Sequence, residues 1–265
     1  MLTILGYRIA ATMARVLPAP LAEALAVALA RLAFDCRVPA RRALEENLAR
    51  LLPRTPAAAR RRHARGAFET FARSFADFLR GRSPAAGVRV VGERHLASAL
   101  ASGRGVIVLS AHLGNWEGGA AAMAAQGCPL HLAARPQAHA PLEALFASRR
   151  AAAGVRALPA GRLMPAAACV LRRGEWIALM ADRGPARSGG ASVCAWAAVL
   201  AQRTGALVLP AVFVREVGGG HRLHVEAPIE AAACRDGAFR DTMLGWLARW
   251  PDQWAAFESL PEGLA

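Results

Sequence analysis

The segment VLSAHLGNWEGG, residues 108–119, contains the side chains best suited to chemistry in this sequence. An apolar run ends at Ser110, His112 follows, and Glu117 stands five positions after the histidine. A histidine held at one ring nitrogen by a carboxylate can act as a general base, taking a proton from an attacking hydroxyl through its other nitrogen. The pair therefore indicates either general-base catalysis or two polar residues at a strand-to-helix turn.

The spacing of this pair is a weak signal by itself, because the sequence contains it twice. The second copy, His221 and Glu226, lies in an expected strand, where an odd separation points the two side chains to opposite faces. His112 instead follows an expected strand, and Asn115 is a good cap for a helix that carries Glu117 in its first turn. We therefore expect the first copy to form the dyad.

Two regions of different pattern surround this segment. Residues 1–85 predict helices, including a stripe of phenylalanines at helical spacing, and we treat them as a helical N-terminal subdomain. In residues 86–265, short apolar runs alternate with Ala-rich stretches, which is typical of an α/β fold. We expect strands at residues 88–91, 105–110, 129–134, 175–181, 207–214 and 221–227. We expect helices at residues 93–102, 115–126, 140–153, 164–173, 192–204 and 238–249.

The predicted fold is thus α/β, with a mixed, largely parallel sheet flanked by helices and a helical N-terminal segment. The sequence EVGGGH, residues 216–221, predicts a tight hairpin that makes the last two strands antiparallel.

The composition is strongly basic. The sequence has 265 residues, is 55% hydrophobic and carries a formal net charge of +14, and its 33 basic residues are all arginines. Arginine binds phosphate and carboxylate groups in a bidentate manner, so we expect an anionic partner: nucleic acid, anionic lipid or an acidic carrier protein. Aromatic residues are not interleaved with the arginines, which disfavours nucleic acid. The arginines at 60, 61, 62 and 65 form either a binding patch or a solvated face.

The N-terminal stretch is apolar but interrupted by charges, and no uncharged run reaches the roughly 18 residues of a spanning helix. The broken apolar run also disfavours a signal peptide. As a helix, it places Leu2, Leu5, Ile9, Met13 and Val16 on one face, flanked by Arg8 and Arg15. This pattern indicates either an interfacial helix on a membrane or a helix packed on the protein body.

Several reaction types have no motif in the sequence. There is no G-x-S-x-G nucleophile elbow, and no cysteine has an obvious base beside it, so direct transfer to an acceptor hydroxyl is favoured over a covalent acyl-enzyme. P-loop and H-E-x-x-H motifs are missing, and we expect neither a metal nor a cofactor. The five cysteines are widely spaced without C-x-x-C, which indicates reduced thiols in a cytoplasmic setting.

The segment GRGVIVLSAHLGNWEGG resembles the first motif of the bacterial lipid A biosynthesis acyltransferases, the lauroyl/myristoyl transferase branch of the lysophospholipid acyltransferase superfamily. Further segments resemble the same family in the same order, from residue 41 to residue 257. They are RRALEENLARLLP, VVGERHLASAL, AARPQ, LRRGEWIALMADR, LAQRTGALVLPAVFVR and PDQWAAF. A collinear series of this kind is far more specific than one histidine.

The resemblance implies that His112 is the general base and Glu117 its orienting carboxylate. It implies that Arg135, Asp182 and Arg183 line the active-site cleft, where ligands of open α/β sheets gather, and we place Asn115 among these substrate-binding residues. Two alternatives stay open: Arg135 as a surface arginine that caps a loop, and Asp182 as a structural partner of Arg183 or Arg187.

The expected reaction moves a fatty acyl group from a thioester to a hydroxyl of a membrane glycolipid or phospholipid. The donor would be acyl carrier protein or acyl-CoA, and the partners would include anionic membrane lipid but no nucleic acid. The expected location is the cytoplasmic face of the inner membrane, with the protein peripheral or N-terminally anchored.

The sequence departs from the family at DRGPARSGGASVCAW, which is shorter than the corresponding family segment and lacks its Phe-Phe-Gly element, and Arg183 replaces the expected glutamine. Two alternatives follow. One is an acyltransferase for another lipid-like product, such as an aryl-polyene pigment. The other is a non-catalytic relative that binds lipid or carrier protein.

Overall fold

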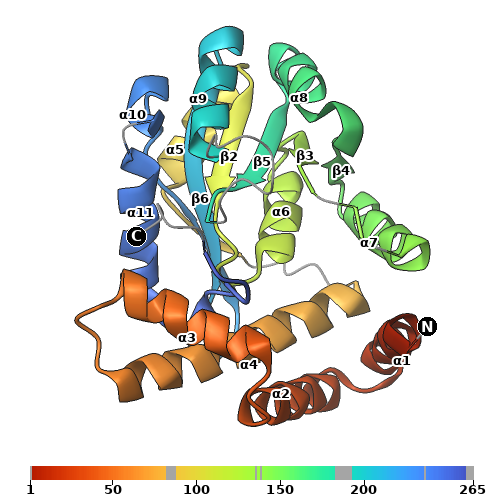
Figure 1. The fold of residues 1–265 in the computed structure, drawn as a ribbon. Coiled ribbons are helices and arrows are strands. Elements are labelled where there is room, and N and C mark those ends of the chain that lie inside the picture. The colour runs from red at the N-terminus through yellow and green to blue at the C-terminus, as the bar shows by residue number, and fades with distance from the viewer. Residues whose placement is uncertain are drawn as a thin grey trace.

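The computed structural model describes residues 2–81, 88–134, 136–137, 139–182, 193–235 and 237–260. In this part of the chain seven strands form one mixed sheet with helices on both faces, which confirms the predicted α/β fold (Figure 1). The strands are β1 (Arg89–Val91), β2 (Val106–Ser110), β3 (Leu130–Leu132), β4 (Arg156–Ala157), β5 (Trp176–Met180), β6 (Leu207–Arg215) and β7 (His221–Val225).

The strand order across the sheet is β1-β7-β6-β2-β5-β3-β4. The central strand β2 is parallel to both of its neighbours, β5 and β6. The β6–β7 pair is antiparallel, as the EVGGGH turn predicted. The six predicted strands are confirmed. β4 was not predicted, because it consists of two exposed residues and has no apolar pattern.

The helices that follow the first strand cover the two faces of the sheet. They are α5 (Glu93–Ala101), α6 (Trp116–Ala125), α7 (Ala140–Ala152), α8 (Leu163–Arg172), α9 (Val193–Thr204), α10 (Ala231–Arg235) and α11 (Ala238–Arg249). All of them except the five-residue α10 were predicted. Alternate residues of β2 face opposite sides, so Ile107 and Leu109 pack into one hydrophobic core while Val106 and Val108 pack into the other.

Four helices form the N-terminal segment: α1 (Leu2–Val16), α2 (Ala19–Asp35), α3 (Pro39–Leu51) and α4 (Ala57–Arg80). Gly81 ends α4 in a left-handed conformation with φ +70°. α3 and α4 lie across one end of the sheet (Figure 1), and Phe71 of α4 stacks on Trp116 just beyond β2, with ring centroids 5.9 Å apart. The helical segment therefore covers the carboxyl end of the central strand.

The helical segment and the sheet share one core, since Phe34, Leu44 and Leu48 belong to the same buried cluster as Ile107. The predicted division between residues 85 and 86 falls among residues 82–87, outside the described part of the chain. No described helix is long and apolar enough to cross a membrane.

Candidate active site

The parallel register of β2 and β5 places His112 beside Asp182. Ser110 and Met180 are register partners at the ends of these strands, and each stands two residues before a functional side chain. The His112 ring nitrogen Nδ1 lies 2.8 Å from Asp182 Oδ1, and the His112 backbone N–H donates to Oδ2 at 3.0 Å. One carboxylate thus holds both the ring and the backbone of the histidine.

A short segment near the C-terminus, residues 253–255, completes this arrangement, and we call it the C-terminal strap. The Trp254 indole N–H donates to Asp182 Oδ2 at 2.9 Å. The strap also holds the histidine loop through its backbone: Gly114 N–H donates to the Gln253 carbonyl at 2.9 Å, and Ala255 N–H donates to the His112 carbonyl at 2.7 Å. The loop that presents His112 is therefore fixed from both sides.

Asp182 is fully buried yet ionised. Burial by itself would raise the pKa of this carboxyl group, but the charge of His112 and the hydrogen bonds from His112 and Trp254 outweigh it and hold the pKa below its ordinary value. A buried carboxylate whose two oxygens both accept hydrogen bonds can fix the tautomer of the histidine and stabilise an imidazolium. Because Nδ1 is engaged, Nε2 is the nitrogen that a substrate can reach.

The predicted pairing of His112 with Glu117 is corrected by this geometry. The Glu117 carboxylate receives two hydrogen bonds from Arg150 of α7, at 2.5 Å and 3.1 Å, and both side chains are largely buried. Glu117 sits in the first turn of α6, as predicted, but it faces α7, whereas the register of β2 and β5 brings Asp182 to the ring. The structure therefore gives the position at Nδ1 to Asp182.

The turn between β2 and α6 forms as the sequence indicates. Asn115 caps α6, its side-chain oxygen accepting the Gly118 N–H at 3.0 Å, and its side chain is buried. Gly114 has φ +71°, and a Cβ added there would lie 2.0 Å from the Phe213 carbonyl oxygen. Asn115 therefore has a structural role as a helix cap, and its contact with substrate stays a prediction.

A cavity of about 610 Å³ opens beside His112 and extends between α6 and the sheet. His112 and Ser110 line it together with Glu117 and Arg150, while most of its wall is apolar. The apolar side chains include Val108, Met123, Leu130, Leu132, Ala178 and Met180. Gly119 and Ala120 of α6 also line the cavity, and Gly119 packs closely on β6, since a Cβ added there would lie 2.7 Å from Phe213 Cβ.

The other predicted site residues fall outside this cluster or outside the described chain. Arg135 and Arg183 belong to the residues that the structure does not describe, as does Arg187. Asp182 was placed at the substrate, but it is fully buried behind His112 and supports the histidine instead. In the second His-x-x-x-x-Glu copy, His221 stacks on Phe213 while Glu226 accepts the Trp246 indole N–H, so the two side chains serve separate contacts, as predicted.

Three functional contributions were missed in the sequence: the pairing of Asp182 with His112, the Trp254 indole, and Arg150. The first had a usable signal, because His112 and Asp182 each follow the end of a predicted strand, and in the structure each stands two residues beyond its strand. For Trp254 the only signal was the resemblance of PDQWAAF to the Gln-Trp segment of the family, which assigns no role to the tryptophan. No signal in the sequence pointed to Arg150, because its pairing with Glu117 depends on how α7 packs against α6. Within the described residues, no group of three or more His, Cys, Asp or Glu side chains could hold a metal ion.

The described chain is thus an open α/β sheet with a histidine–carboxylate pair at the carboxyl end of its central strand, beside a largely apolar cavity, at the edge of the sheet where ligands of such folds bind. The family model for the bacterial lipid A biosynthesis acyltransferases matches residues 2–248, and the chain belongs to this family. A comparison with curated proteins gives no match. The family is one of lipid acyltransferases, in agreement with the resemblance seen in the sequence.

Proposed function

We propose that this protein transfers a fatty acyl group from a thioester donor to a hydroxyl of a membrane glycolipid or phospholipid, with His112 as the general base. The observation that carries the proposal is the His112–Asp182 pair at the wall of a largely apolar cavity. We assign the orienting role to Asp182 rather than to Glu117.

In the proposed reaction, His112 Nε2 takes the proton from the acceptor hydroxyl as its oxygen attacks the thioester carbonyl carbon. Asp182 stabilises the imidazolium that forms. The tetrahedral intermediate then collapses, the carbon–sulfur bond breaks, and the departing thiolate takes the proton from the imidazolium. The products are an ester of the acceptor and a free thiol, and His112 returns to its starting form.

The cavity suits the acyl chain of the donor. Its wall combines strand side chains such as Val108 and Ala178 with the small residues of α6, and His112 lies at its polar end. Each methylene of an acyl chain gains roughly 0.8 kcal/mol on leaving water for such surroundings. A chain buried there would hold its thioester carbonyl near His112.

We place the protein on the membrane surface that carries its acceptor, the cytoplasmic face of the inner membrane. Most of the exposed large hydrophobic residues in the described chain lie on α1 and α2. They are Ile9, Met13, Val16, Leu21, Leu25, Leu29 and Leu32. The α2 residues follow one another at helical spacing, so they form a stripe that suits an interfacial position. The side chains of Leu2, Leu5 and Arg8 lie outside the described part of the chain.

For the donor we favour acyl carrier protein, with acyl-CoA as the alternative. Exposed arginines near the start of α4, Arg61 and Arg62, would attract an acidic carrier. The rest of the predicted arginine patch is engaged internally, since Arg60 donates to the Thr55 carbonyl and Arg65 pairs with Asp35 at 2.9 Å.

The test is a transfer assay with the full chain, acyl carrier protein or CoA thioesters as donors, and vesicles containing bacterial glycolipid or phospholipid acceptors. His112→Ala should abolish transfer, whereas His95→Ala, a change at a histidine outside the cavity, should leave it intact. Turnover retained in the His112 variant would overturn the mechanism.

Two other outcomes discriminate the alternatives. Vesicle or carrier binding by the wild-type chain with no turnover for any donor would identify a non-catalytic relative. Mass spectrometry of lipids and pigments from cells with and without the gene would reveal a pigment acceptor if one is used.

A further inference from the structure

Ser110 is the last residue of β2, and its side chain lines the cavity. Alternate residues of a strand point to the same face, so Val108 and Ser110 lie one after the other along the cavity wall, and His112 lines it two residues further on. An occupant of the cavity would therefore meet an apolar side chain, then a hydroxyl, then the imidazole. A thioester donor has its parts in the same order: the acyl chain, the carbonyl group, and the carbon that the acceptor attacks.

The Ser110 hydroxyl is available to a ligand. No described residue makes a hydrogen bond with it, and Ser110 is the one residue with an aliphatic hydroxyl among the described residues that line the cavity. The charged residues of the wall, Glu117 and Arg150, are paired with each other. A hydroxyl in a largely apolar wall is unfavourable without a partner, so an acceptor oxygen of a bound substrate would be stabilised here.

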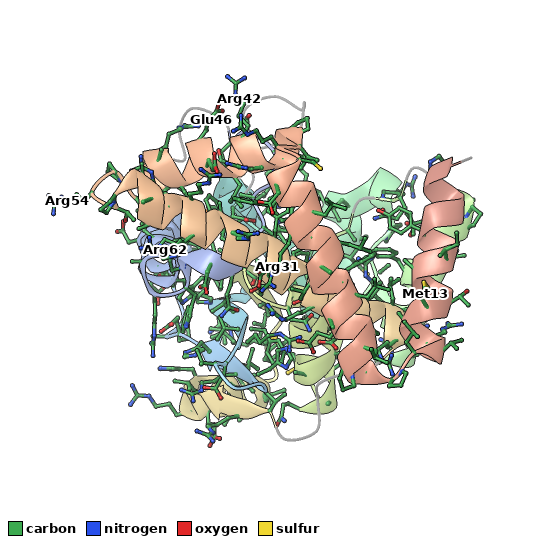
Figure 2. The ribbon with its side chains drawn as sticks, turned by 90° about the horizontal axis from the view of Figure 1, so that it is seen from below. Met13, Arg31, Arg42, Glu46, Arg54 and Arg62 are labelled. Carbon is green, nitrogen blue, oxygen red and sulfur yellow. The ribbon has the colours of Figure 1, made fainter. Side chains whose placement is uncertain are left out.

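The surroundings of this hydroxyl limit the access of water. The N-terminal helices cover this end of the sheet, and Figure 2 shows α2, which carries Arg31, and α3, which carries Arg42, lying across the molecule on this side. Closer to the site, Trp116 lines the cavity and packs against the His112 ring, with the ring centroids 5.2 Å apart. Hydrogen bonds are stronger where apolar groups displace water, and a donor fixed at the end of a strand needs little reorganisation during a reaction.

Building on the proposed acyl transfer, we propose that Ser110 is a further catalytic residue, whose hydroxyl donates a hydrogen bond to the thioester carbonyl oxygen. When the acceptor oxygen attacks, an electron pair of the C=O double bond moves onto the carbonyl oxygen. The Ser110 O–H stabilises this oxyanion and keeps its own proton. When the intermediate collapses, the pair forms the C=O bond again, the carbon–sulfur bond breaks, and the thiolate takes the proton from His112.

The competing role for Ser110 is that of a nucleophile, because Ser110, His112 and Asp182 have the residue types of a serine nucleophile with its base and orienting acid. The structure, which describes all three residues, favours the donor role. It has no hydrogen bond between the Ser110 hydroxyl and the His112 ring, and a nucleophile loses its proton through such a bond. Ser110 also ends a strand without the G-x-S-x-G turn that exposes a nucleophilic serine.

The experiment measures the turnover number and KM of the full chain, with the thioester donor and the vesicle acceptor that the wild-type protein uses. Ser110→Val and Ser110→Thr are the matched pair, because the two new side chains have the same branched shape and only threonine has a hydroxyl. Ser110→Val should lower the turnover number about 100-fold with little change in KM, because the hydrogen bond strengthens in the transition state. Ser110→Thr should lose much less. Equal losses in the two variants would overturn the proposal, because shape and not the hydroxyl would then explain them.

Mass spectrometry of the intact protein after incubation with donor alone tests the competing role. The donor role predicts no added acyl mass, whereas an acyl ester on Ser110 would overturn it. Thermal unfolding should show both variants to be as stable as the wild-type protein, because the hydroxyl makes no hydrogen bond with the described residues. If Ser110→Val does not fold, the smaller Ser110→Ala takes its place in the comparison with Ser110→Thr.

The assay also separates this role from the proposed function. An active wild-type protein with an equally active Ser110→Val variant would contradict the role of Ser110 alone. A wild-type protein that transfers no acyl group from any donor would contradict the proposed function and the role of Ser110 together.

Discussion

The indole N–H of Trp254 donates to Asp182, 72 residues earlier in the chain, and both side chains are fully buried. Asp182 thereby receives three hydrogen bonds, from the His112 ring, the His112 backbone and the Trp254 indole. A carboxylate held in this way has little freedom to reorient, so the ring that it supports is fixed before substrate arrives.

Asp182→Asn should lower the turnover number by about 10³- to 10⁴-fold, because the amide keeps the volume of the side chain but cannot stabilise the imidazolium. Glu117→Gln should have a much smaller effect on turnover, because the His112–Asp182 hydrogen bond stays in place. Steady-state kinetics well below the unfolding temperatures of both variants would measure the difference. If Glu117→Gln proved as damaging as Asp182→Asn, the assignment of the orienting carboxylate to Asp182 would be wrong.

Removing either partner of the Glu117–Arg150 ion pair should destabilise the protein by about 3 kcal/mol, because the remaining charge is left largely buried and uncompensated. The double variant Glu117→Gln/Arg150→Met should lose less than the sum of the single losses, with a coupling free energy of about 1–3 kcal/mol. Urea unfolding of the four proteins measures this cycle. Strictly additive losses would show that the two side chains are not coupled in solution.

Gly114→Ala should cost about 3 kcal/mol or more of the free energy of unfolding, because the new Cβ would meet the Phe213 carbonyl and the residue would be held at positive φ. Gly127→Ala is the matched control: its φ is +88°, but a Cβ there has nothing within 4 Å. The free energy of unfolding of this control should fall only by the cost of the backbone strain, about 1 kcal/mol. Thermal or urea unfolding compares the two, and similar losses would argue against close packing of the histidine loop on β6.

His221 should make the protein less stable in mild acid. Burial and the charge of Arg215 lower its pKa to about 4, from an ordinary value of 6.5. Between these values the unfolded chain binds a proton that the folded chain excludes, so the stabilisation is present above pH 6.5 and is lost as the pH falls toward 4. Between about pH 7 and about pH 5 the loss should be on the order of 2 kcal/mol, and less to the extent that solvent reaches the ring.

The comparison for this prediction is His221→Phe, which keeps a ring against Phe213 but does not titrate. Its free energy of unfolding should fall less than that of the wild-type protein over the same pH range. A wild-type protein with the same pH dependence as the variant would show that His221 does not contribute.

The sequence predicted the elements of the fold well, because its apolar runs are long and its turn residues are clear. Val106–Ser110 and Trp176–Met180 are largely buried strands, and the glycines at 218–220 mark the hairpin. β4, with two residues, and α10, with five, were not predicted, because such short segments show no clear periodicity of apolar residues.

For the site, the sequence identified His112, and the wrong carboxylate was paired with it. Spacing along the chain favoured Glu117, but the decisive neighbour is set by register: Ser110 lies beside Met180, and a shift by one residue would turn Asp182 to the other face. The role of Trp254 could not be predicted, because it depends on the path of a segment that returns from the far end of the chain to the histidine loop.

The C-terminal strap also fixes the order in which the contacts that support His112 become complete during synthesis. Leu113 pairs with Trp254 in an isolated bridge, so the histidine loop finds its last support in residues that the ribosome makes more than a hundred positions after it. A nascent chain that has already produced His112 and Asp182 still lacks the indole that restrains the carboxylate. The full support of His112 therefore requires residues that are made long after the histidine itself.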